Sequence, residues 1–115
     1  MTYFRKLADR PAFLGIEFDL YSLDSVLWLT AEHVSQALKR DHRALVRALP
    51  APMSPWEARR ELLPVWNYRY HMEVNHVRTL YSVDGALRLC VASSPDERAS
   101  DFAAWLRRLK GSIHE

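Results

Sequence analysis

Two stretches of the chain alternate apolar and polar residues, and the first of them predicts a β-hairpin near the N-terminus. Every second position from residue 16 to residue 20 is apolar, which is the period of a strand that buries one face. A turn at Asp24-Ser25 would fold this strand onto a second one over residues 26–29. Residues 1–12 show no such alternation, so we expect them to form a loose leader.

The second alternating stretch covers residues 66–74 and predicts another strand. A turn at Asn75-His76, followed by a return strand over residues 77–81, would complete a second hairpin. Because consecutive hairpins commonly join edge to edge, the chain is expected to build one small antiparallel sheet.

Helical spacing of apolar residues predicts two short helices after the first hairpin. Thr30 is placed to cap a helix over residues 31–38, whose apolar positions fall on one face. Asp41 can cap a second helix that runs through Leu49. The two helices would be joined by a short basic turn.

Serine residues mark the expected starts of three more helices. Ser54 is followed by Pro, Trp and Glu, which predicts a short helix that ends before Pro64. Ser82 and Ser94 are placed to cap two consecutive helices near the C-terminus. Both of these helices carry an apolar face, so both are expected to dock on the sheet.

The predicted elements indicate an α+β fold, in which a small antiparallel sheet of two hairpins is packed with several short helices. The chain has 115 residues, enough for one compact domain and too few for two ordinary ones. We place a single domain over residues 13–115. Hydrophobic residues make up 49% of the chain, which allows a core and argues against disorder.

The single cysteine, Cys90, excludes a disulfide within the chain. It falls on the apolar stripe of a predicted helix, which favours a small buried hydrophobe over a nucleophile. No apolar run is long enough for a signal peptide or a membrane span. We therefore expect a soluble protein of a reducing bacterial cytoplasm.

Two parts of the chain resemble one known family. The C-terminal element reads Ala99-Ser-Asp-Phe102-Ala-Ala-Trp105, and the N-terminal part combines the strands Ile16–Phe18 and Val26–Leu29 with the helix Thr30–Leu38. In this order of apolar residues, residues 13–110 resemble the Bro-N domain of baculovirus repeated-ORF proteins and phage antirepressors. The resemblance implies a phage or prophage protein of transcription regulation that binds DNA.

The richest basic run lies at the junction of the first two predicted helices. Arg and Lys side chains in such a place suit phosphate contacts, and Arg can also contact guanine edges. A solvated helical face is the alternative, since the net charge of the whole chain is only +2. The candidate nucleic-acid-binding residues in this run are Lys39, Arg40, His42, Arg43 and Arg47.

A second candidate for nucleic-acid contact is the face of the second hairpin that carries Arg69, with His71 and Arg78. Flanking tyrosines can stack on unpaired bases. Strict alternation, however, sends Tyr68 and Tyr70 to the face opposite Arg69. We therefore expect both tyrosines to lie in the core.

No arrangement of residues predicts catalysis. His71, Glu73 and His76 lie close in sequence, but their spacing matches none of the usual zinc patterns. The three glycines are far apart and form no phosphate-binding loop. We expect a non-enzymatic protein with no cofactor and no metal.

Two functions from different classes remain open. The first is duplex DNA binding through the basic junction. The second is a protein-interaction module that binds and inhibits a repressor or another host protein, with Met53 and Trp56 as contacts, because Met and Trp are enriched at interfaces. A homodimer is compatible with both.

Overall fold

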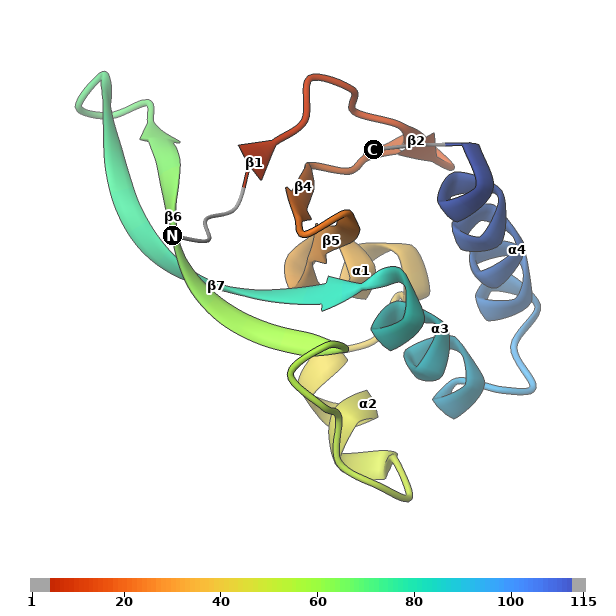
Figure 1. Cartoon of the computed structure of the whole chain (residues 1–115). Helices are drawn as coiled ribbons and strands as arrows, with labels where there is room; N and C mark the ends of the chain where they lie inside the picture. The colour runs from red at the N-terminus through yellow and green to blue at the C-terminus, as the bar shows by residue number, and fades with distance from the viewer. Residues whose placement is uncertain (1–4, 113–115) are drawn as a thin grey trace.

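The computed structural model describes residues 5–112, except for the side chains of Val65 and Trp66. Within this part, four helices pack on a five-stranded antiparallel sheet with the order β1-β4-β5-β7-β6, and a two-stranded hairpin, β2-β3, lies beside it (Figure 1). The predicted α+β fold is confirmed. The strands are β1 Arg5–Lys6, β2 Ala12–Phe13, β3 Ile16–Glu17, β4 Leu20–Leu23, β5 Val26–Thr30, β6 Ala58–Asn67 and β7 Met72–Ser82. The helices are α1 Ala31–Leu38, α2 His42–Ala48, α3 Val83–Ala92 and α4 Glu97–Ser112.

The N-terminal hairpin turns where the sequence predicts it. Asp24 and Ser25 both have positive φ, at 51° and 64°, as the tight two-residue turn between β4 and β5 requires. The first predicted strand is split, however, because β3 pairs with β2 in the small separate hairpin. Residues 5–12 of the expected loose leader are structured in part, since β1 pairs with the edge of β4, and residues 1–4 lie outside the described residues.

Strands β6 and β7 form a long hairpin, which we call the arm, and its outer part projects away from the helices (Figure 1). The arm replaces two predicted elements that are wrong. The helix expected after Ser54 is absent, because residues from Ala58 onward pair with β7. The turn expected at Asn75-His76 lies instead at residues 68–71, which we call the arm tip, so Asn75 and His76 lie within β7 and pair with β6.

The predicted helices outside the arm are confirmed. The Asp41 carboxylate accepts from the Arg43 amide at the start of α2, and the Ser82 hydroxyl accepts from the Gly85 amide at the start of α3. Two caps differ from the prediction. Thr30 stands at the N-cap of α1, but its hydroxyl contacts Nδ1 of His33 instead of accepting from a backbone amide of the helix. The start of α4 also differs. Asp96, rather than Ser94, accepts from a first-turn amide, that of Arg98.

Apolar side chains pack on both faces of the sheet. The larger cluster lies under the helices and holds residues such as Phe18, Leu29 and Phe102. Cys90 belongs to this cluster, and burial raises the pKa of its thiol to about 12, as a buried hydrophobe requires. A smaller cluster centres on Trp28 and Leu80 on the opposite face. None of the described helices has the length and apolar character that crossing a membrane needs.

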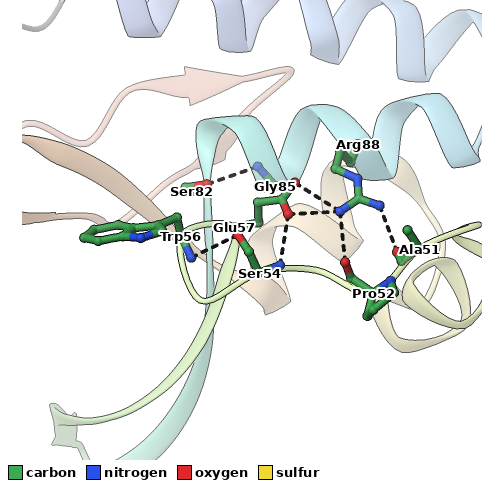
Figure 2. A network of polar contacts seen from close by, with 8 residues as sticks. All are labelled: Ala51, Pro52, Ser54, Trp56, Glu57, Ser82, Gly85 and Arg88. Carbon is green, nitrogen blue, oxygen red and sulfur yellow. Dashed lines mark hydrogen bonds and ion pairs between the residues drawn. The ribbon is translucent and has the colours of Figure 1, made fainter.

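A polar clamp ties the segment before β6 to helix α3 (Figure 2). The Glu57 carboxylate accepts from the Ser54 amide at 2.9 Å and from the Arg88 guanidinium at 3.0 Å. Both contacts hold the pKa of Glu57 below its ordinary value, the Ser54 amide more than Arg88. Arg88 also donates to the backbone carbonyl of Ala51 at 2.8 Å. The segment between α2 and β6 is therefore fixed to α3 at several points.

The clamp needs a glycine at position 85. A Cβ on Gly85 would lie 2.1 Å from the carbonyl oxygen of Glu57, and that oxygen also accepts from the Ser82 amide. The two backbones therefore approach more closely than any larger residue allows.

Gly85→Ala is expected to lower the free energy of unfolding by about 1–3 kcal/mol or more, because backbone must move to admit the methyl group. Gly111→Ala is the matched control, since a Cβ there meets nothing within 4 Å in the same class of element. The control should be neutral, or stabilising by up to about 1 kcal/mol. Chemical denaturation of both variants measures the difference, and equal stability of the two would contradict the close packing.

Candidate functional site

A groove of about 730 Å³ lies between the first two helices and the base of the arm. Its walls come from three directions: the start of α1, one face of α2 and the proximal part of β6-β7. The charged and hydrogen-bonding side chains along it are Asp19, Tyr21, Thr30, Glu32, His33, His42, Arg43, Arg47, Arg60, Arg78, Thr79 and Tyr81. Arginine supplies four of these, which makes the groove the strongest candidate for a binding site.

Helix α2 presents two arginines to the groove because of its register. Leu45 is buried against the core, which turns the helix so that Arg43 and Arg47 lie in the groove wall. Residues four apart share one face of a helix, so their guanidinium groups can act on one ligand. The Arg43 guanidinium lies 3.7 Å from the Asp41 carboxylate, whereas the Arg47 guanidinium forms no hydrogen bond or ion pair with a described residue.

The arm contributes the other two arginines from neighbouring strands. Arg60 lies directly opposite Thr79 in the β6-β7 pairing, and Arg78 is the next residue along β7. Arg78 forms an ion pair with Glu32 at the start of α1, which links the arm to the helices across the groove. The Arg60 guanidinium forms no ion pair or hydrogen bond within residues 5–112. The groove therefore holds two arginines that are not committed to a carboxylate.

The side of the groove at α2 is held by a contact between a histidine and a tyrosine. Nδ1 of His42 lies 2.7 Å from the Tyr81 hydroxyl, and the two rings meet edge to face. The His42 amide also donates to the Ser35 hydroxyl. Burial lowers the pKa of His42 and raises that of Tyr81 to about 12, so both groups are neutral near pH 7. His42 thus anchors α2 to the sheet in addition to lining the groove.

The residues expected to bind nucleic acid fall in three places. Arg43, Arg47 and His42 line the groove. Lys39 and Arg40 lie on a shallow depression beside it, where Arg40 approaches Asp96 at 4.0 Å. These five residues therefore lie close together, in the groove and on the depression next to it.

Arg69 lies apart from the groove, at the arm tip, where its guanidinium is over the Tyr70 ring. The prediction that Tyr68 and Tyr70 are buried is wrong, because 81% of Tyr68 and 63% of Tyr70 is exposed. The cause is the position of the turn: both tyrosines lie in the tip rather than within a strand that has a buried face.

Sequence reasoning missed Arg60 altogether and gave Arg78 only a minor place. Arg60 lies in Ala-Arg-Arg-Glu-Leu-Leu, a segment of good helix formers without the alternation of a strand. The sequence could have indicated a strand at Arg60 only indirectly, because the long alternating strand β7 requires a partner strand of similar length.

The two residues expected to contact a protein partner have different surroundings. Met53 is half-buried and packs against the large apolar cluster. Trp56 is 59% exposed and lies beside a small pocket of about 210 Å³ that includes Val26 and Lys110. Only Trp56 is therefore available at the surface as a large contact residue.

Within residues 5–112 no group of three or more His, Cys, Asp or Glu side chains is placed to hold a metal ion. No family model, no curated protein and no solved structure matches the chain.

The His42 contact predicts a dependence of stability on pH. Because the pKa of His42 is lower in the folded protein than its ordinary value of 6.5, the unfolded chain binds this proton first as the pH falls. The stability that neutral His42 contributes is present above pH 6.5 and is lost as the pH falls through the lower, folded pKa.

His42→Asn keeps a polar group near Tyr81 without a titratable one, so the variant should lose this component of the pH dependence. Denaturant unfolding between pH 8 and pH 5 measures it as the difference between the two proteins. Parallel stability curves for both would show that His42 does not titrate as described.

Proposed function

We propose that the protein binds duplex DNA in the arginine groove, as a regulatory domain without catalytic activity. The observation that carries the proposal is the convergence of Arg43 and Arg47 from α2 with Arg60 and Arg78 from the arm on one groove. The guanidinium groups of Arg47 and Arg60 form no ion pair with a described residue, although Arg47 is near enough to Asp41 to help lower the pKa of that carboxyl. Repulsion between neighbouring arginines raises the free energy of the folded state, and a bound polyanion would remove this repulsion.

The arrangement favours an extended polyanion over a small anion. The four arginines come from three elements, α2, β6 and β7, and line an open groove of about 730 Å³. Lys39 and Arg40 continue the basic surface past the end of the groove, next to Arg43. A DNA duplex presents a phosphate about every 1.7 Å of helix axis when both strands are counted, so one duplex can meet all of these groups.

The resemblance of residues 13–110 to the Bro-N domain supports the same proposal, because it implies a DNA-binding antirepressor-like protein. The resemblance depends on the order of apolar residues, whereas the groove depends on arginines. The two arguments are therefore independent.

Arg43→Ala combined with Arg47→Ala is expected to weaken binding to duplex DNA of any sequence. Each lost phosphate contact should cost about 1.4 kcal/mol, or about tenfold in affinity. The slope of log affinity against log salt concentration should become shallower by about 0.9 for each lost contact. Fluorescence anisotropy with a labelled random duplex of about 20 base pairs, titrated at several salt concentrations, measures both quantities.

The matched control is Arg107→Ala combined with Arg108→Ala, which removes the same charge from exposed positions on α4 outside the groove. This control should bind nearly as tightly as the unchanged protein. Arg60→Ala tests the opposite wall and should resemble one of the α2 substitutions. Absence of association at low salt, or an equal loss in the control, would overturn the proposal.

Trp56 supports a second candidate function, in which the protein docks on a repressor or another host protein. Its exposed fraction of 59% is high for a tryptophan, and Trp is the residue most enriched at the centres of interfaces.

Trp56→Ala should then abolish stoichiometric recovery of one partner from a bacterial lysate while DNA binding stays unchanged. A Val91→Ala variant, at another exposed apolar position, serves as the control. Identical recovery from both variants would count against a docking role for Trp56.

A further inference from the structure

The arm tip carries the most exposed aromatic side chains of the described residues. Tyr68 is 81% and Tyr70 63% exposed, although burial of an aromatic ring is favourable by several kcal/mol in general. Most of the surface of both rings therefore stays in contact with solvent at the end of a projecting hairpin. The tip is therefore a candidate contact surface.

Hydrogen bonds close the turn at the tip. The Asn67 carboxamide oxygen accepts from the amides of Arg69 and Tyr70, at 2.9 and 3.2 Å, which closes the turn. The Arg69 guanidinium lies over the Tyr70 ring, 5.6 Å from its centroid. Below the turn, β6 and β7 are paired at every position back to the body. Little conformational entropy would be lost when the tip binds.

The chemistry of the tip suits bases better than phosphates. Residues 68–73 contain one arginine and one glutamate, so their formal charge is zero when His71 is neutral. Such a segment does not attract a phosphate backbone by itself. Its aromatic faces and its arginine plane can stack on bases, and stacking on tyrosine is largely independent of sequence.

The same arm also carries Arg60 and Arg78 to the groove, so the tip and the groove are joined by one continuous element. Asn67 lies seven residues beyond Arg60, at most about 24 Å away, because antiparallel strands rise about 3.4 Å per residue. This distance corresponds to about seven base pairs of duplex. A DNA molecule seated in the groove can reach the tip.

We propose that the arm tip is a second nucleic-acid contact, in which Tyr68 and Tyr70 stack on bases that are unpaired within a DNA duplex held by the groove. The inference rests on the proposed function and deepens it, because it names the ligand as duplex DNA with a local distortion. The groove supplies affinity for phosphates, and the tip supplies preference for unstacked bases.

The test uses the full chain and two labelled duplexes of about 24 base pairs, one fully paired and one with two central unpaired bases. One unpaired base is 2-aminopurine, whose fluorescence falls when the base stacks on an aromatic ring. The protein should bind the distorted duplex about 5- to 30-fold more tightly and should quench the 2-aminopurine signal.

Tyr68→Ala combined with Tyr70→Ala should remove the preference and the quenching. Tyr68→Phe combined with Tyr70→Phe should keep both, because phenylalanine stacks without the hydroxyl. Val91→Ala, at an exposed apolar position on α3, should behave as the unchanged protein. Circular dichroism and thermal unfolding establish that all three variants fold.

The outcomes separate the two proposals. If both duplexes bind equally in a salt-dependent manner, or if the alanine variant keeps the preference, the tip proposal is overturned and the groove proposal stands. If neither duplex binds at low salt, both proposals fail. If the Arg43→Ala and Arg47→Ala variant binds poorly but the alanine tip variant loses only the preference, both are supported.

Discussion

Strand β7 is paired on two sides at its C-terminal end and on one side along the rest of its length, and this asymmetry shapes the molecule. Leu80 and Tyr81 pair with both β5 and β6, so backbone pairing and burial together fix this end of the strand. Among the described residues, only β6 pairs with β7 from Thr79 outward, and the hairpin projects from the body as the arm. The groove lies where the arm leaves the body. On one side His42 of α2 contacts Tyr81 of β7, and on the other Arg60 and Arg78 lie on the arm.

The distance between the two arginine-bearing walls depends on contacts that the four groove arginines do not themselves make. Arg88 and Gly85 on α3 hold the segment that precedes β6, and Tyr81 holds His42 at the start of α2. The two walls are thus fixed to the same part of the core. Four like charges can be kept close together because the backbone that carries them is fixed elsewhere, with Glu32 as one of the few nearby carboxylates.

The elements that sequence reasoning found are those whose signals are local. Helix α1, with its apolar stripe, and the tight turn at Asp24-Ser25 each depend on residues that are close together in the sequence. At Ser54 a local signal was also correct, because the Ser54 amide does bond Glu57, but the expected helix does not follow. Pairing with β7 decides the structure from Ala58 onward, and partner strands are not encoded within the segment itself.

The errors at the candidate site have the same origin. The sequence offers two asparagines as turn residues, Asn67 and Asn75, and the structure turns after Asn67. A turn at Asn75 would put both tyrosines within a strand, whereas the actual turn puts them in the tip. The sequence does not indicate Arg60 as a site residue, because the pattern of its segment predicts a helix and not a strand. In contrast, Arg43 and Arg47 were found because their helix could be placed from its cap and its buried leucine alone.

Pro64 on the outer strand of the arm has a consequence for the behaviour of the protein at high concentration. Strand β6 is at the edge of the sheet, and the unpaired backbone groups of an edge strand can pair with a strand of a second molecule and so extend the sheet. A proline has no amide hydrogen to offer, and Arg59 and Glu61 add charge to the same strand. The arm can therefore stay long and partly apolar without seeding fibrils.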